Sequence, residues 1–360
     1  MDVFRGWLQL QIFASHAYGS WIGGWLIHGA WGLSDSSEQF LFLSGFTLGS
    51  VFARKAARQS WWAATTDMLG RTWRLYRTHL TVVIFFFFMV ALAGLSRDLP
   101  MEAQRLGWGF LANEPLLAVP ALLSMLYQPA FMGILPIFVW CMLALPAFAW
   151  AEARWGDAAL VGSFFLYAVS WGLDFWPPSL GPETGIGFNP FAWQFLFLAG
   201  AWLGRRALLL GQALPPLRWL TVLSVLIVLA GFYLRLSWYD FGLVPALFTE
   251  DTLIVGKEGL AFPRLIHALA LAWLVSVAVP RDADWMHLLV ARWLTAIGRH
   301  SLQVFCLGLF LSWGCTAAFR LWPGRWWLDP LLMVLGSLLL VAFARGLDHR
   351  RMVQRRVVPA

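Results

Sequence analysis

Arg5 and His16 are the first residues whose types and spacing could do chemistry. Ten residues separate them in a segment, 1–26, that is otherwise almost wholly apolar. An α-helix turns by about 100° per residue, so His16 returns to within about 20° of the direction of Arg5, about 16 Å further along the axis. Ionisable groups at membrane depth usually face the bundle interior or an aqueous cavity, so we expect a functional pair. The alternative is a histidine that only holds the helix bundle together.

A second polar group, Ser34 to Glu38, precedes the next apolar run. Asp35 and Glu38 are one turn apart, and a carboxylate bonded to one imidazole nitrogen fixes the tautomer of the ring and raises its basicity. This pair is therefore a candidate to orient a general base or to hold an acceptor. The same spacing is typical of a capping box at a helix start. Both interpretations stay open.

Small residues follow in the next apolar run, at Ser44, Gly45 and Gly49. Such residues allow close approach of helices in a membrane. No G-x-S-x-G elbow surrounds Ser44, so the sequence favours helix packing over a nucleophilic serine.

Three arginines at three-residue spacing, Arg71, Arg74 and Arg77, precede the third apolar segment. Arg71 and Arg74 share a helix face, and paired guanidinium groups suit bidentate phosphate binding. With Arg5 they form a candidate phosphate cradle on the cytoplasmic side. Ordinary topology-setting charge accounts for part of the pattern. The chain has no P-loop and no G-x-G-x-x-G fingerprint, which argues against a nucleotide triphosphatase.

Three later residues are candidates for substrate binding: Asn189, Gln194 and His300. Asn189 stands before Pro190, which is also typical of a helix cap. Gln194 follows Trp193, a pair that suits a sugar ring, although tryptophan at this depth is commonly a membrane anchor. His300 lies in an apolar segment, and we expect it to line the cavity.

The composition determines what kind of elements must position these groups. Of the 360 residues 60% are hydrophobic and only 12% are charged, about half the charge of a soluble protein. The apolar residues fall into runs of roughly 16–24, long enough to cross a ~30 Å hydrocarbon core. The basic residues are divided between these runs, so nucleic-acid binding is not expected. The three cysteines have no metal spacing, no metal site is predicted, and no cleavable signal peptide is expected.

We predict an all-α integral membrane protein with about ten transmembrane helices in one bundle. The predicted spans are 5–27, 36–53, 79–96, 131–150, 157–173, 190–204, 219–236, 263–279, 293–316 and 327–345. Lys and Arg gather in alternate connections while 237–262 is acidic, so by the positive-inside rule both termini are cytoplasmic. Residues 106–128 are interrupted by prolines and predict a re-entrant or interfacial segment. The chain is expected to be one domain, 1–360, with a short basic cytoplasmic tail, 346–360.

Together these elements resemble the membrane acyltransferase 3 superfamily, and more closely its OpgC branch, succinyltransferases of osmoregulated periplasmic glucans. The Arg5-to-His16 spacing matches the Arg-ten-residues-His element of the superfamily, and Arg71 with Arg74 matches its Arg-x-x-Arg element. The run Phe-Leu-Ser-Gly-Phe at 42–46 matches its second-span signature. OpgC-like details run in order along nearly the whole chain: Ser34-Asp35 with Glu38, residues 74–79, Tyr127-Gln128-Pro129 with Leu135-Pro136, residues 188–194 and Gly298-Arg299-His300-Ser301.

The resemblance implies a bacterial inner-membrane enzyme that moves an acyl group, succinyl by expectation, from cytoplasmic acyl-CoA to a glucan hydroxyl in the periplasm. His16 would be the catalytic base, and Arg71 and Arg74 would meet the coenzyme A end. Acyl-CoA would be a co-substrate, with no permanently bound cofactor. Expected partners are the glucan, the bilayer, and a second copy of the chain or a glucan-synthesis protein. Two departures from the family are expected: no cytoplasmic element before Arg5 and no fused periplasmic domain.

Two other classes of function compete with this interpretation. A transporter or flippase of a glycan or acyl donor would line a pathway with the same groups and do no bond chemistry; broken helices in paired positions would favour it. A non-catalytic scaffold is disfavoured, because it gains nothing from burying so many ionisable groups. Thioester cleavage separates the enzyme from the transporter.

Overall fold

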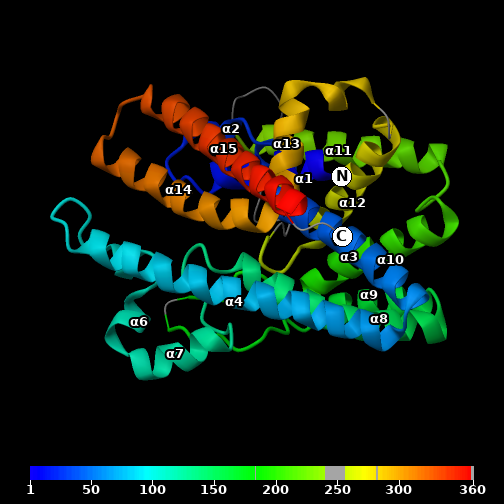
Figure 1. Ribbon diagram of the computed structural model, residues 1–360. Helices are drawn as coiled ribbons and strands as arrows, with labels where there is room; N and C mark the ends of the chain where they lie inside the picture. The colour runs from blue at the N-terminus through cyan, green and yellow to red at the C-terminus, as the bar shows by residue number, and fades with distance from the viewer. Residues whose placement is uncertain (183, 240–255, 281–282, 358–360) are drawn as a thin grey trace. The chain divides into compact units, whose positions relative to one another are not determined.

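The structure, a computed structural model, describes residues 1–182, 184–239, 256–280 and 283–357. Every regular element within these ranges is a helix (Figure 1). The helices among them that are long and apolar enough to cross a membrane are α4 (Trp61–Gly94), α8 (Ile134–Trp155), α11 (Arg218–Trp238), α14 (Ser301–Leu321) and Leu328–Gln354 of α15 (Leu328–Val357). The chain is thus an all-helical membrane protein, as predicted. Most of the acidic connection at 237–262 lies outside the described residues.

Most predicted spans correspond to one helix each. In addition to α8, α11 and α15, these helices are α3 (Ser36–Arg58), α9 (Ala158–Gly172), α10 (Pro190–Leu210) and α12 (Phe262–Ala278). Helix α4 begins well before the predicted start at residue 79, because the polar stretch that carries the arginines is itself helical. With 34 residues it is about 51 Å long, more than the apolar core of a bilayer requires.

The predicted spans 5–27 and 293–316 are wrong as continuous helices, since each is interrupted at a histidine. The first consists of α1 (Asp2–Ser15), a turn and the short α2 (Trp21–Trp25), which the 3₁₀ turn η1 (His28–Ala30) follows. Gly19 has a φ of +96°, and the Ser20 hydroxyl caps α2. Such a turn cannot be predicted from the apolar content of the segment alone. The second consists of α13 (Leu289–Arg299) and α14, with His300 between them.

Residue contacts divide the described chain into two compact units. Unit 1 is formed by Met1–Phe40, Trp219–Leu247 and His267–Ala360, and unit 2 by Leu41–Arg218 and Phe248–Ile266. The candidate residues are divided between the units: Arg5, His16, Asp35, Glu38 and His300 belong to unit 1, and Arg71, Arg74, Arg77, Asn189 and Gln194 to unit 2.

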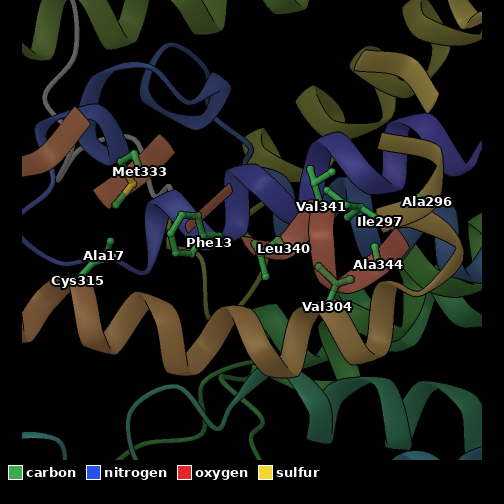
Figure 2. Packing of buried hydrophobic residues seen from close by; sticks show 10 residues of the cluster. All are labelled: Phe13, Ala17, Ala296, Ile297, Val304, Cys315, Met333, Leu340, Val341 and Ala344. Carbon is green, nitrogen blue, oxygen red and sulfur yellow. The ribbon is translucent and has the colours of Figure 1, made fainter. Parts of the chain in front are cut away.

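Unit 1 is built around α1. A Cβ atom on Gly6 would overlap the main-chain oxygen of Leu294, and one on Gly298 would overlap that of Asp2. These reciprocal contacts bring α1 and α13 together with no side chain between them, in antiparallel directions. Figure 2 shows the apolar cluster that α1 and α13 form with α14 and α15. Its buried members are Phe13, Ala17, Ala296, Ile297, Val304, Cys315, Met333, Leu340, Val341 and Ala344.

Unit 2 contains the close helix pair that the small residues predicted. Cβ atoms on Gly45 and Gly49 would overlap the main-chain oxygens of Phe197 and Ala201, four residues apart on α10. The two helices therefore run parallel and touch through their backbones. Ser44 is buried on the same helix, and the packing interpretation of this run is confirmed.

The interrupted segment 106–128 also belongs to unit 2. It contains α6 (Gly109–Asn113) and α7 (Pro115–Leu123) and follows α5 (Glu102–Arg105). Each helix is too short to cross a bilayer. The segment is nevertheless anchored, because Trp108 is fully buried and stacks on Phe86 of α4.

Candidate active site

His16 lies at the C-terminal end of α1, where the helix stops. Its ring is half-buried, and Nδ1 is 2.8 Å from the main-chain oxygen of Ile12. A carbonyl oxygen only accepts, so this contact assigns the proton of the neutral ring to Nδ1 and the lone pair to Nε2. An imidazole held in that tautomer is suited to remove a proton through Nε2.

Arg5 lies in the first turns of the same helix, where its Nη1 is 3.9 Å from the Asp2 carboxylate. Helix α1 is unbroken from Arg5 to His16, which keeps αR geometry at the helix end. The predicted relation of the two residues is confirmed: they share a face and are separated by the rise of eleven residues, about 16 Å. The Arg5 side chain is only 15% exposed, so this cation is mostly buried within unit 1.

His300 lies at the Arg5 end of α1. It follows Gly298, whose Cα packs against the main chain of Asp2. The ring is 1% exposed, and its Nε2 lies 3.0 Å from Oδ1 of Asp348, in the C-terminal part of α15. A carboxylate accepts the Nε2 proton here. This position favours a role beside Arg5 over contact with an acceptor at the far end of α1, and the acceptor role of His300 stays a prediction.

Asp35 and Glu38 form the predicted capping box at the start of α3. Asp35 Oδ1 accepts from the backbone N–H of Ser37 (2.7 Å) and from its hydroxyl (2.5 Å), and Glu38 Oε2 accepts from the backbone N–H of Asp35 (3.0 Å). Glu38 is fully buried and Asp35 is half-buried. The structural interpretation is therefore confirmed, and a role of this pair in orienting His16 stays a prediction.

A second histidine, His28, lies beside this box and was missed in the sequence. Its backbone N–H donates to Gln11 Oε1 (2.9 Å), and its Nδ1 lies 3.2 Å from the same oxygen. Burial lowers the pKa of His28, although the Asp35 carboxylate opposes the shift. Gln11 lies on α1, 17 residues before His28, and nothing in the sequence indicated that the two would meet.

The lowered pKa of His28 predicts a loss of stability at acid pH. As pH falls below the ordinary histidine pKa of about 6.5, the unfolded chain binds a proton that the folded protein refuses until the pH is lower, so the free energy of unfolding decreases through that window. In His28→Gln the thermal midpoint in detergent should fall less between pH 7.5 and 5.5 than in the wild type. His287→Gln, at an exposed histidine, is the control and should keep the wild-type pH dependence. Equal slopes for His28→Gln and the wild type would refute the assignment.

His267 is a further buried histidine of unit 1 that the sequence did not single out. Its Nδ1 accepts from the backbone N–H of Ser34 (3.3 Å) and lies 2.8 Å from the Ser34 hydroxyl. Cβ atoms on Gly32 and Gly231 would crowd this ring at 2.7 Å. The two glycines thus provide the space for an imidazole next to the residue that precedes Asp35.

The arginine cluster of unit 2 lies on the N-terminal half of α4. Arg71 Nε donates to Asp67 (2.8 Å), and Lys55 of α3 lies 3.2 Å from the other oxygen of that carboxylate. Arg74 and Arg77 are exposed. The cluster is more extensive than the sequence predicted, since Asp67 holds Lys55 and Arg71 together and leaves the terminal nitrogens of Arg71 for another ligand.

Asn189 and Gln194 are committed to bonds within unit 2. Asn189 caps α10 by accepting from Phe191 N (3.0 Å), and its amide donates to Phe175 O (2.8 Å). Gln194 accepts from the Ser163 hydroxyl (2.6 Å) and donates to the Ser163 carbonyl (2.9 Å). The cap interpretation of Asn189 is confirmed, and sugar binding by either residue stays a prediction.

The anchor interpretation of Trp193 is wrong. Its side chain is fully buried, and Nε1 donates to the main-chain oxygens of Lys257 and Glu258. The ring closes the segment 256–261 over α10 instead of facing a membrane interface.

Unit 2 also contains a cavity of about 290 Å³ that none of the predicted residues lines. Its walls come from α3, α8 and α10 with Trp61 of α4, and are mainly alanine and other apolar side chains. One ion pair borders it, Arg205 to Glu152 at 2.7 Å. Among the described residues, no group of three His, Cys, Asp or Glu side chains could hold a metal ion.

The sequence model of one family, described as OpgC protein, matches residues 1–352. The chain belongs to the OpgC family. No curated protein and no solved structure matches it. The match covers both units, so the arginines of unit 2 and His16 of unit 1 belong to one OpgC module, and membership indicates an acyltransferase-like, glucan-modifying function in a membrane.

Proposed function

We propose that this OpgC-family protein is an O-acyltransferase of the bacterial inner membrane. It transfers an acyl group, succinyl as the expected one, from cytoplasmic acyl-CoA to a hydroxyl of a periplasmic glucan. In this proposal both termini are cytoplasmic and the chain crosses the bilayer about ten times, with α14 in place of the predicted span 293–316. The family match over residues 1–352 and the apolar helices support this proposal.

The observation that carries the proposal is the hydrogen bond from His16 Nδ1 to Ile12 O. It places the proton of the neutral ring on Nδ1, so that Nε2 is the nitrogen that carries the lone pair. A histidine that acts as a general base must be neutral before the reaction, with its proton-accepting nitrogen held in a fixed direction.

The reaction needs one proton transfer to and from His16. Nε2 removes the proton of the sugar hydroxyl while that oxygen attacks the thioester carbonyl and forms the new C–O bond. The tetrahedral intermediate collapses, the C–S bond breaks, and the imidazolium returns the proton to the coenzyme A thiolate. Donors aimed at the carbonyl oxygen stabilise the intermediate. Transfer through an acyl-enzyme is the alternative, and the two routes differ in whether a covalent species forms without acceptor.

Arg71, Arg74 and Arg77, with Arg5, bind the phosphates of the coenzyme in this proposal. Arg74 and Arg77 are exposed on α4, and the Asp67 carboxylate fixes Arg71 in direction. Such a preformed cluster suits a polyanionic ligand. Asp35 and Glu38 are proposed to orient the acceptor near His16, and Asn189 and Gln194 to shape the acceptor route.

The experiment that tests the function is release of coenzyme A by the purified protein. Succinyl-CoA or acetyl-CoA is supplied with and without a β-glucan, and free thiol and acylated glucan are both measured. Acceptor-dependent release with a matching amount of acyl-glucan is expected. Acyl-CoA binding without turnover on any glucan tested would contradict the acceptor class, and absence of binding would contradict the enzyme.

The arginine assignment has its own variants. Arg71→Gln with Arg74→Gln should raise the KM for acyl-CoA tenfold or more, because each charge-assisted hydrogen bond contributes about 1.5–3 kcal/mol. Arg97→Gln, an exposed arginine beyond the other end of α4, is the matched control and should leave KM unchanged. An unchanged KM in the double variant would mean that these arginines only set the membrane topology and do not bind acyl-CoA.

A transporter or flippase is the second candidate, and one observation favours it. Two predicted spans are broken, at His16 and at His300, and discontinuous helices are typical of substrate sites in transporters. The thiol measurement separates the candidates, because a transporter leaves the thioester intact. Movement of a glycan into liposomes without thiol release would favour this second function.

A further inference from the structure

The turn that follows His16 is held by a buried carboxylate from the far end of the chain. Asp329 lies in the first turn of α15 and is 3% exposed. Its Oδ1 accepts from the Ser20 hydroxyl (2.7 Å), and its Oδ2 accepts from the backbone N–H of Ile22 (2.9 Å). Ser20 Oγ in turn accepts from the backbone N–H of Gly23 (2.8 Å). One carboxylate therefore fixes both the start of α2 and the turn before it.

Two hydroxyls of α14 hold the same stretch from another side. Thr316 Oγ1 accepts from the backbone N–H of Tyr18 (2.9 Å), and Ser312 Oγ lies 2.9 Å from the Phe13 carbonyl. Figure 2 shows Phe13, Ala17 and Met333 together within the apolar cluster, and Met333 is one turn after Asp329 on α15. The segment that carries His16 is thus clamped before and after the histidine.

The chemistry of the clamp indicates why a charged group is used. A buried carboxylate is costly unless donors satisfy it, and here each oxygen has one. Charge-assisted hydrogen bonds are shorter and stronger than neutral ones. An amide in the same place would have to turn its own N–H₂ group toward one of the two donors. A carboxylate is therefore the side chain that holds this turn in a single arrangement.

We infer that Asp329 is the positioning residue of His16: it fixes the turn at Ser20 to Ile22 and so keeps the imidazole aligned at the end of α1. The inference rests on the proposed acyl transfer for its kinetic consequence. It has a separate structural consequence, because release of the turn must change the environment of the His16 ring whatever the protein does.

The test compares Asp329→Asn and Ser20→Ala with the wild type in detergent. Ser20→Ala removes two bonds, to Asp329 Oδ1 and from the backbone N–H of Gly23, and leaves Asp329 in place with its bond from the backbone N–H of Ile22. It therefore remains informative where Asp329→Asn fails to fold. We expect kcat for acyl transfer to fall at least tenfold in Asp329→Asn, with the KM for acyl-CoA within twofold. The double variant should be no slower than Asp329→Asn, since both changes break the same clamp. Ser312→Ala removes the hydrogen bond to the Phe13 carbonyl, on the other side of His16, and should lower kcat less.

A second readout needs no activity. The rate at which diethyl pyrocarbonate modifies His16, measured by mass spectrometry, should change severalfold in Asp329→Asn and Ser20→Ala, while the rate at the exposed His287 stays constant. A wild type that transfers no acyl group would refute the proposed function, and the His16 modification rate would then decide the inference alone. Unchanged modification rates and unchanged kcat in both folded variants would overturn it.

Discussion

His16→Ala should lower kcat for acyl transfer by about 10²- to 10⁴-fold, the usual contribution of a general base. The loss follows from Nε2, which the Nδ1 bond to Ile12 O leaves as the proton acceptor. Folding should survive, since the His16 ring is only half-buried and its backbone N–H still donates to Ile12 O (3.1 Å). Coenzyme A release with a glucan acceptor measures the rate, and the thermal midpoint reports folding.

His287→Ala is the matched control for this result. His287 is exposed on the 3₁₀ turn η2 (Asp284–His287), so its loss should leave kcat and the midpoint unchanged. A His16→Ala protein that retains most of its activity would make His16 a structural residue and would refute the proposed mechanism. A variant that binds acyl-CoA as well as the wild type and releases no thiol would support it.

Gly45→Ala should cause a large loss of stability for the addition of a single methyl group. The new Cβ would overlap the main-chain oxygen of Phe197, and a backbone atom cannot turn away as a side chain can. Helix α10 must then move, which breaks the neighbouring contact of Gly49 with Ala201. We expect a decrease of about 1–3 kcal/mol or more in the free energy of unfolding, measured by denaturant unfolding in micelles.

Gly162→Ala, in the same unit, should have the opposite effect on stability. Gly162 lies in α9, and no atom comes within 4 Å of a Cβ built there. Alanine should stabilise this helix by up to about 1 kcal/mol, because glycine loses more backbone freedom on folding. Equal effects of the two substitutions would mean that α3 and α10 do not touch through their backbones.

The sequence predicts features of this chain that depend on nearby residues. Apolar runs locate α8 and α11 because a membrane helix satisfies all its backbone bonds internally. The cap at Asp35 follows from residue type and the three-residue spacing to Glu38, and the cap at Asn189 follows from the proline after it. The small residues at Gly45 and Gly49 predict a close helix neighbour, although they do not say which helix it is.

Features that depend on distant residues could not be predicted. Asp329 and Ser20 are 309 residues apart, and Ser34 and His267 are 233 apart. No periodicity connects such pairs. The break at His16 was missed for another reason: a turn built from Gly19 and a capping serine is compatible with a continuous apolar run. Only the packing of α15 against this turn shows where α1 must end.

The continuous helix α1 fixes the distance between Arg5 and His16. Eleven helical steps set about 16 Å between Arg5 and His16, the residues proposed to bind a phosphate and to remove the proton. One inserted residue would lengthen this interval by about 1.5 Å and rotate the imidazole by about 100°, off the shared face. Four inserted residues would nearly restore the face but add about 6 Å. In the proposed reaction, the acyl donor is therefore selected by its length as well as by its affinity. A thioester can react only when the distance between its phosphates and its carbonyl carbon matches the distance between Arg5 and His16.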